Sequence, residues 1–236
     1  MCVLTYLPTP DGFILTNNRD EHASRSRALA PRRYVLHGQE VFFPKDQQAG
    51  GTWLATSPQQ TVCLLNGAFE PHHPRPPYRQ SRGLVVLDFF GFCCAAGFAK
   101  TYIFEGLEPF TLLVFESNQT LKITELRWDG ERVFQREIDA AQPRIWSSVT
   151  LYPSAVMEAR EGWFKDWQQT NPVFEAGSIW EFHHQGGNGD RRNDLVMARP
   201  NGIHTFSVTQ VQKAGETLCL AYQDLRSGEE WRGRVL

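Results

Sequence analysis

The chain has 236 residues, of which 41% are hydrophobic and 21% are charged, and its formal net charge is -2. This apolar content is enough for a folded core and excludes a disordered chain, and the length fits one domain spanning residues 1–236. A nearly balanced charge excludes the broad positive field that gathers nucleic acid. We therefore expect a folded protein whose partner is a small molecule. The oligomeric state is left open.

Three sequence features bear on the cellular compartment. No basic region precedes an apolar run at the N-terminus, unlike a secretory signal. The longest apolar stretch, residues 84–98, contains Asp88 and is shorter than the roughly 20 residues of a spanning helix, so a buried helix and no membrane span are predicted. The five cysteines lack a paired framework, which predicts free thiols and a cytoplasmic protein. They are Cys2, Cys63, Cys93, Cys94 and Cys219.

The first elements in chain order form a predicted β-hairpin. Residues 2–7 and 13–16 are rich in β-formers and are separated by a turn that contains proline and glycine. This hairpin would bring Cys2 close to the polar segment 17–21. The arginine-rich segment 25–33 lacks periodicity, so an irregular surface connection is predicted there.

The rest of the chain combines predicted strands with two helical segments. A loop rich in proline and histidine over 70–77 precedes a long helix expected over 82–100, for which Ser81 is the candidate N-cap. A second helix is predicted after Ser154, through about residue 169. Two helical blocks among antiparallel strands predict an α+β fold with sheets covered by helices. The predicted strands cover 53–55, 61–65, 110–116, 120–128, 132–138, 202–212, 217–222 and 230–236.

Cys2 is the first candidate for chemistry, because removal of the initiator methionine would leave a thiol and an α-amine on one residue. The unperturbed pKa values of these groups are about 8.5 and about 7.7–8.0, so the amine can serve as the base for its own thiol. Arg19 would favour the thiolate, and Asp20 would orient the amine. Two alternatives stay open. A cysteine at this position is often buried packing, and the tetrad Asn18 to Glu21 can equally be a solvated hairpin end with local salt bridges.

Several segments together match one family, in the order that the family shows. They are Met1-Cys2, the Leu-Thr-Asn-Asn-Arg-Asp-Glu of 15–21, the Gly-Gly-Thr-Trp-Leu-Ala of 50–55, and shorter matches at 65–67, 81–83 and 109–113. The chain resembles the NRDE family, named for its Asn-Arg-Asp-Glu motif, whose eukaryotic relatives are called transport and Golgi organisation proteins. The resemblance implies a four-layer α-β-β-α fold of the N-terminal-nucleophile hydrolase type. Similar folds in penicillin acylases and bile-salt hydrolases cleave non-peptide amide bonds.

The resemblance also implies roles for individual residues. Cys2 is the expected nucleophile with its α-amine as base, and Arg19 and Asp20 are expected beside it. Asn66 would direct its side-chain amide at the developing oxyanion, where one donor typically contributes about 3–4 kcal/mol. An equally common use of Asn66 is as a type I′ hairpin residue before Gly67, and that alternative stays open.

Two segments depart from the family pattern. Where relatives carry a Ser-Asn pair, this chain has a Ser-Ser pair ending at Ser148, which leaves Ser148 as a weaker substitute donor. Near the C-terminus, relatives carry Gly-Thr-Arg-Ser where this chain has Gly-Asp-Arg-Arg over 189–192, so Arg191 is the candidate active-site arginine. Asn18 and Glu21 complete the candidate binding residues.

The remaining motifs have simpler interpretations. Paired histidines at 72–73 and 183–184 are interpreted as solvated loops, because no cysteine or carboxylate cluster lies at metal-ligand spacing near them. Neither a metal nor a cofactor is expected. The glycine-rich segment 185–190 lacks the pattern of a phosphate-binding loop and is interpreted as a flexible loop. The aromatic residues of 163–167 fit the buried face of a helix.

Three functions are compatible with these features. The first is a cysteine-dependent amidohydrolase, which the retention of Cys2, Arg19, Asp20 and Asn66 favours. The second is a noncatalytic carrier of a hydrophobic ligand such as haem or an acyl lipid. The third is an interaction protein whose active site is dead. Fold alone does not decide among them.

Overall fold

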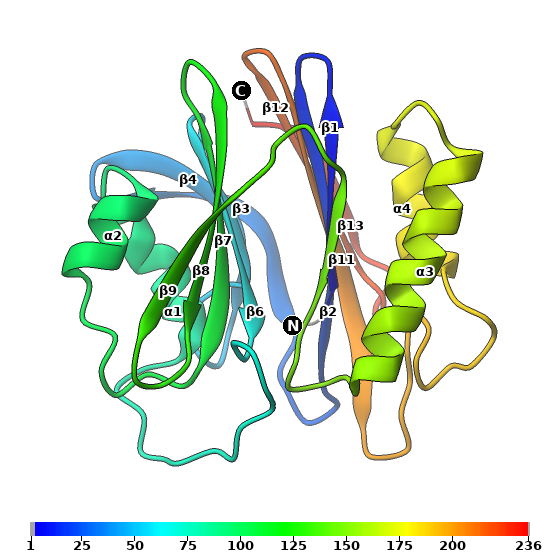
Figure 1. Cartoon of the computed structure of the whole chain (residues 1–236), viewed down its shortest axis with the longest axis horizontal. Coiled ribbons are helices and arrows are strands. Elements are labelled where there is room, and N and C mark those ends of the chain that lie inside the picture. Colours follow the sequence, from blue (N-terminus) through cyan, green and yellow to red (C-terminus); the bar gives the residue numbers. More distant parts are fainter. Residues whose placement is uncertain (1–2, 236) are drawn as a thin grey trace. The chain divides into compact units, whose positions relative to one another are not determined.

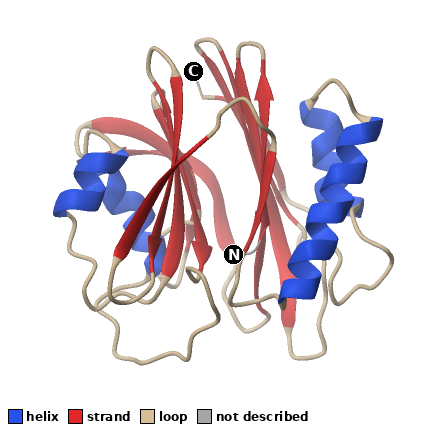
Figure 2. Cartoon of the chain, in the orientation of Figure 1, coloured by secondary structure: helices blue, strands red, loops and turns tan. Residues whose placement is uncertain are grey.

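The computed structural model describes residues 3–235 and contains two antiparallel sheets with helices (Figures 1 and 2). The strands are β1 Val3–Thr9, β2 Gly12–His22, β3 Ala28–Leu36, β4 Gln39–Asp46, β5 Leu54–Thr56, β6 Gln60–Asn66, β7 Phe110–Ser117, β8 Leu121–Trp128, β9 Val133–Ile138, β10 Arg144–Ser147, β11 Ile203–Ala214, β12 Thr217–Asp224 and β13 Glu230–Arg234. The helices are α1 Arg82–Asp88, α2 Ala95–Thr101, α3 Ser154–Thr170 and α4 Ala176–Gln185, with a 3-10 turn η1 at Phe89–Gly91.

The chain divides into two compact units, each with one sheet and two α-helices. Unit 1 contains the six-stranded sheet, in the order β10-β1-β2-β11-β12-β13, together with α3 and α4. Unit 2 contains the seven-stranded sheet from β3 to β9 in sequence order, together with α1 and α2. The predicted α+β class with mostly antiparallel sheets is confirmed. That residues 1–236 form one domain stays a prediction. Unit 1 comprises Met1–Arg25, Ala141–Ser148 and Tyr152–Leu236, and unit 2 comprises Ser26–Ala140 and Val149–Leu151.

The hairpin and helix predicted for unit 1 are present. Strands β1 and β2 pair from Val3 opposite Asn18 to Thr9 opposite Gly12. Helices α3 and α4 cover one face of this sheet (Figure 1), and Phe164 of α3 is buried there as predicted. Each fully buried side chain of this kind contributes about 1.5–3 kcal/mol. The core cluster under the helices comprises Val3, Leu7, Ile14, Phe164, Ile179, Phe182 and Leu195, with Trp163 and Trp167 packed against it.

The single long helix predicted over 82–100 is wrong. Helix α1 ends at Asp88, η1 follows, and α2 begins at Ala95 with its axis turned by 114°. Phe92 is extended at this break, and the turn lets Phe89 and Phe98 pack together with a ring-centroid distance of 5.3 Å. Burying both aromatic rings outweighs the helix propensity of a continuous segment. Ser81 occupies the N-cap position of α1 but makes no side-chain capping hydrogen bond.

The irregular connection predicted over 25–33 is also wrong, because β3 covers Ala28–Leu36. Pro31 obscured the strand pattern. It lies in a register irregularity between Leu29 and Arg32, and β3 is an edge strand of its sheet. A strand tolerates proline in both of these settings. Strands β4 and β10 and helix α4 were likewise absent from the sequence-based prediction.

Over residues 3–235, no single helix is long and apolar enough to cross a membrane. Within that range, only the bent pair Arg82–Gly91 and Ala95–Thr101, taken together, has the length and the apolar composition of a membrane span. The four described cysteines, Cys63, Cys93, Cys94 and Cys219, are free thiols as predicted. Cys2 lies outside the described residues.

Two glycines of the family-like segments touch each other in unit 2. A Cβ atom built on Gly51 would lie 2.3 Å from the backbone carbon of Gly83, a distance that no real contact shows. The amide of Thr52 donates to the carbonyl of Gly83 at 3.0 Å, so the two backbones are held together. The glycines of the Gly-Gly-Thr and Ser-Arg-Gly segments therefore allow the two backbones to touch at the start of α1.

Replacement of Gly51 by alanine is expected to lower the free energy of unfolding by about 1–3 kcal/mol, since the added methyl must push two backbones apart. Gly162 is the matched control. It lies within α3 with no atom within 4 Å of a built Cβ, so Gly162→Ala should stabilise by roughly 0.5–1 kcal/mol. Urea unfolding of both variants measures the difference. Equal stability of Gly51→Ala and the parent protein would show that the segments are free to separate.

Candidate functional site

The polar tetrad predicted as a site lies on β2, and the strand divides it between two faces. Asn18 and Asp20 hydrogen-bond to residues of the helix-bearing side of unit 1. Arg19 and Glu21 lie on the opposite face, because successive side chains of a strand alternate. The tetrad is therefore part of the sheet, and its first three residues are buried. The alternative of a solvated hairpin end is wrong for Asn18, Arg19 and Asp20.

Asn18 makes a closed set of hydrogen bonds beneath α4. Its side-chain nitrogen donates to the carbonyls of His183 at 2.9 Å and Leu195 at 2.7 Å, and its side-chain oxygen lies 2.7 Å from Nδ1 of His183. Nε2 of His183 is 2.8 Å from the hydroxyl of Thr5. Every polar atom of this Asn-His pair is used within the protein. Asn18 thus anchors a helix, and its predicted role in ligand binding stays a prediction.

The interpretation of residues 183–184 as a solvated loop is wrong. His183 is fully buried in α4, four residues after the buried Ile179. Burial lowers the pKa of His183 to about 3, helped by the charges of His184 and Arg160. The histidine is therefore neutral at physiological pH. The i, i+4 spacing from Ile179 is the signal that identifies this position as part of a helix.

Asp20 is held by two hydroxyl groups on the helix-bearing side. Thr205 of β11 donates to one carboxylate oxygen at 2.5 Å, and the hydroxyl of Tyr152 donates to the other. Asp20 and Tyr152 are each 2% exposed. Because buried carboxylates require such donors, the pair ties β2 to the segment that precedes α3. Nothing in the sequence pattern around Tyr152 announced this contact.

Tyr152 in turn lies against a buried arginine of α3. The guanidinium carbon of Arg160 is 3.8 Å from the ring centroid of Tyr152. Arg160 also donates through Nη2 to the carbonyls of Asn193 and Asp194 at 2.9 and 2.8 Å. The side chain is fully buried. Sequence reasoning missed Arg160 because arginine is usually a surface residue.

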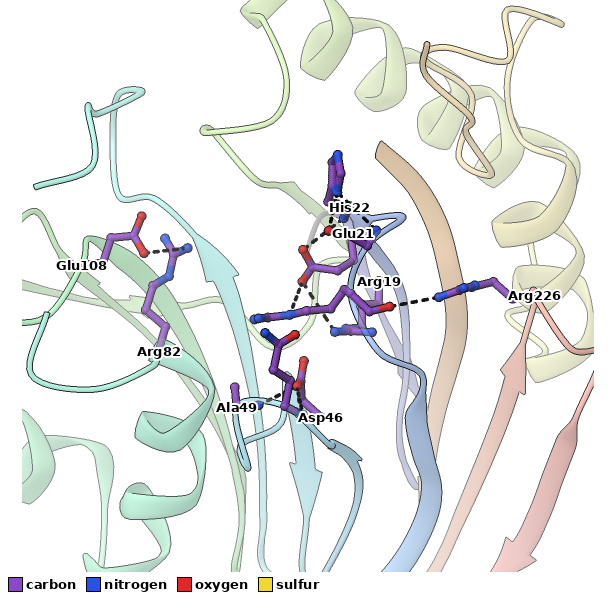
Figure 3. Close-up of polar contacts among 11 residues, drawn as sticks. Arg19, Glu21, His22, Asp46, Ala49, Arg82, Glu108 and Arg226 are labelled. Atoms are coloured by element: carbon purple, nitrogen blue, oxygen red, sulfur yellow. Dashed lines mark hydrogen bonds and ion pairs between the residues drawn. The ribbon is translucent and has the colours of Figure 1, made fainter. Parts of the chain in front are cut away.

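Arg19 is the buried cation of the other face. It is 3% exposed and lies 3.5 Å from a carboxylate oxygen of Glu21 (Figure 3). Its guanidinium carbon is 5.7 Å from the ring centroid of Phe206. Arg25 contacts the same Glu21 oxygen at 3.7 Å but is 32% exposed. Figure 3 also shows Arg226, whose guanidinium lies 4.6 Å from the Phe206 ring centroid. Positive charge is thus concentrated around one carboxylate and one aromatic ring.

Asn17, next to this arginine, was not predicted as a site residue. Its side-chain nitrogen donates to the carbonyl of Val3 at 2.8 Å. Its side-chain oxygen is buried and has no hydrogen-bond partner among residues 3–235. An amide acceptor in this condition usually has an external partner or a functional use. Val3 follows Cys2 directly in the sequence, and Cys2 itself lies outside the described residues.

Asn66 ends β6 in unit 2 and is paired with Phe110 of β7. No tight hairpin follows, because β6 continues into a long connection through α1, so the type I′ alternative is wrong. Gly67 has a φ of 83°, and its amide donates to the carbonyl of Pro109 at 3.0 Å. Nearby, Arg82 and Glu108 form an ion pair of 3.0 Å (Figure 3). The oxyanion role of Asn66 stays a prediction.

The other candidate residues have contrasting environments. Ser148 is fully buried directly after β10. Arg191 lies in an exposed turn beyond α4. Their roles as a substitute donor and an active-site arginine stay predictions. Within residues 3–235, no three His, Cys, Asp or Glu side chains converge as metal ligands.

Comparison with known proteins bears on the family and the fold. The family model for Transport and Golgi organisation 2 matches residues 1–163. No curated protein matches the sequence. Among solved structures, the C2A mutant of conjugated bile acid hydrolase from Clostridium perfringens aligns with a TM-score of 0.59 at 10% identity, over 100% of this chain and 92% of that one. An arginine-to-leucine variant of the same hydrolase gives 0.61 at 11% identity, over 99% and 92%. The fold is therefore of the N-terminal-nucleophile hydrolase type.

His183 predicts a pH-dependent stability. Between its folded-state pKa of about 3 and the unfolded value near 6.5, the unfolded chain binds the extra proton. The free energy of unfolding should therefore fall as the pH falls through this window, by up to about 1.4 kcal/mol per pH unit from this group. His183→Gln should unfold more easily at pH 7 but show a shallower slope below pH 6. His204→Gln, at an exposed site, should keep the parent slope, as measured by urea unfolding across the pH range. A parent slope in His183→Gln would contradict the buried neutral histidine.

Tyr152→Phe removes one of the two hydroxyl donors of Asp20 and should lower the free energy of unfolding by about 1–3 kcal/mol, because a buried carboxylate oxygen is left short of a partner. Tyr34→Phe is the matched control, since the Tyr34 hydroxyl has no hydrogen-bond partner among the described residues while its ring stacks on Phe43. Thermal and urea unfolding measure both variants. Equal losses from the two substitutions would mean that the Tyr152 hydroxyl contributes nothing specific.

Proposed function

The chain belongs to the Transport and Golgi organisation 2 family, and from this we propose that it is a cysteine-dependent amidohydrolase of the N-terminal-nucleophile type. Its substrate would be a non-peptide C–N bond in a small molecule. The observation that carries the proposal is the buried Arg19 on β2. The residue before it, Asn18, is paired with Val3 of β1. Val3 follows Cys2 in the sequence. The solved hydrolase structure with cysteine replaced by alanine at position 2 supports the choice of nucleophile.

The proposed reaction begins with removal of Met1, which frees the α-amine of Cys2. The amine takes the thiol proton, and the thiolate sulfur adds to the carbonyl carbon of the substrate amide. The C–N bond then breaks, the amine product leaves with a proton, and a thioester remains on Cys2. Water attacks that thioester, releases the acid and restores the thiol.

Residues of unit 1 would support these steps in different ways. The cationic Arg19 favours the thiolate of Cys2 over the thiol, and its burial keeps that effect from being screened by water. The unpaired side-chain oxygen of Asn17 offers an acceptor for an N–H donor, either the α-amine or the leaving group. Asp20 acts as a positioning residue, because its contacts with Tyr152 and Thr205 hold β2 in place from the opposite face.

The proposal is tested by intact mass and thiol labelling. Protein purified from its native host should lack Met1, and a small thiol-directed electrophile at neutral pH should label it fast at one residue. Cys2→Ala should abolish this labelling. Arg19→Met should slow it roughly tenfold, the effect of a shift of about one pKa unit.

Arg25→Met is the control for lost charge, because Arg25 contacts the same Glu21 carboxylate from a partly exposed position. Its labelling rate should stay close to that of the parent protein. A retained Met1, or a Cys2 labelling rate equal to that of Cys219, would overturn the hydrolase. Amide substrates are worth screening only if processing and fast labelling are both observed.

A further inference from the structure

Cys93 and Cys94 form a pair of touching thiols in unit 2, between η1 and α2. Adjacent side chains in an extended segment point to opposite sides. Here the chain bends, and the two Sγ atoms lie 3.7 Å apart. A Cβ built on Gly97 would lie 3.6 Å from the Cys94 sulfur and 3.7 Å from the Cys93 sulfur, so both sulfurs lie over the same glycine.

The two thiols differ in accessibility and in hydrogen bonding. Cys93 is exposed, whereas Cys94 is partly buried. The sulfur of Cys94 accepts the N–H of Gly97 at 3.4 Å and the S–H of Cys93. The Cys94 sulfur is therefore the hydrogen-bond acceptor of the pair. The hydrogen bond to Cys94 and the nearby Cys94 charge raise the pKa of Cys93, which keeps that thiol protonated.

We propose that Cys93 and Cys94 are a redox modification site, which a low-molecular-weight disulfide such as glutathione disulfide converts to an intramolecular disulfide. The Cys94 thiolate attacks one sulfur of glutathione disulfide, forms a mixed disulfide and releases one glutathione thiolate. Cys93 loses its proton and attacks the Cys94 sulfur, which releases the second glutathione. Two electrons pass from the protein sulfurs to glutathione, and the two protons end on the glutathione thiols.

The bond formed in this way is readily reversed. Adjacent Cα atoms are about 3.8 Å apart across a trans peptide, whereas disulfide-bonded residues usually have Cα atoms roughly 4.4–6.8 Å apart. A bond between neighbours is therefore strained, and strained or exposed disulfides are the ones that reducing agents open most easily. The pair stays a dithiol in a reducing compartment and closes when the glutathione pool becomes oxidised.

Hydrogen bonds to the backbone flank the pair on both sides. Gln60 donates to the carbonyl of Cys93 at 3.2 Å, and Glu116 accepts the amide of Ala95 at 3.3 Å. These bonds hold the backbone on both sides of the pair. Closure draws the Cys94 sulfur toward Cys93 and away from the N–H of Gly97. The first turn of α2 loses its side-chain cap in the oxidised form.

The other described cysteines provide internal controls. Cys63 is fully buried, and burial raises its pKa far above the ordinary range. Cys219 is partly exposed and belongs to the other unit. Neither has a second thiol beside it among residues 3–235. An oxidised glutathione buffer should therefore give a mixed disulfide at Cys219 but an internal disulfide at Cys93 and Cys94.

The experiment uses the full chain carrying Cys2→Ala, so that its result is independent of the proposed hydrolase chemistry. The protein is equilibrated in a graded series of glutathione and glutathione disulfide, quenched with acid, and analysed by intact mass and peptide mapping. We expect the peptide that carries both thiols to lose the mass of two hydrogen atoms, and a reducing buffer to restore it. Cys219→Ser should leave this change intact.

Single substitutions separate closure from simple surface oxidation. Cys93→Ser should trap one glutathione on Cys94, because the resolving thiol is gone. Cys94→Ser should likewise trap one glutathione, on the exposed Cys93, because no second thiol remains to displace it. A dithiol peptide that stays unchanged while Cys219 takes glutathione would overturn the proposal. So would two glutathiones added to the same peptide.

Discussion

Strand β2 carries consecutive polar residues into the interior of unit 1. The polar side chains on each of its two faces therefore need hydrogen-bond partners on that face. On the helix-bearing face, Asn18 is matched to His183, and Asp20 is matched to Tyr152 and Thr205. Buried amides and carboxylates are costly without such partners. The placement of α4 and of the chain before α3 therefore follows from what β2 presents. Val3, Leu7 and Ile14 also pack under the helices, so apolar burial adds to these hydrogen bonds in fixing the helix positions.

The opposite face of β2 has a different character, because it carries charged side chains together with an aromatic ring. Arg19 and Arg25 share Glu21, and two guanidinium groups approach Phe206. The guanidinium of Arg19 on this face would favour an anion such as a thiolate, whereas the buried side-chain oxygen of Asn17 is suited to accept an N–H. One strand thus divides the four polar residues of the motif between two faces, although they look alike in the sequence.

The sequence predicted elements best where pattern and local chemistry agreed. The first hairpin, the strands after Pro109 and the aromatic face of α3 follow from periodicity and turn residues. Prediction failed where tertiary contacts decided the outcome. Aromatic burial broke the helix after Asp88, and an edge position made Pro31 compatible with a strand. In the candidate site, the tetrad was visible as a motif, but its division between two faces required knowing that β2 continues to His22. Tyr152 and Arg160 had no signature, because their partners lie far away in the sequence.

Strand β3 also bears on self-association, since every open sheet exposes unpaired backbone groups at its margins. An incoming strand of another molecule needs a regular row of donors and acceptors to extend the sheet. Pro31 supplies no amide hydrogen, the register slips between Leu29 and Arg32, and the adjacent Arg32 and Arg33 are exposed and positively charged. Fibril-like stacking is thereby disfavoured at this margin. The irregularity that hid the strand from sequence analysis protects the protein from aggregation through that edge.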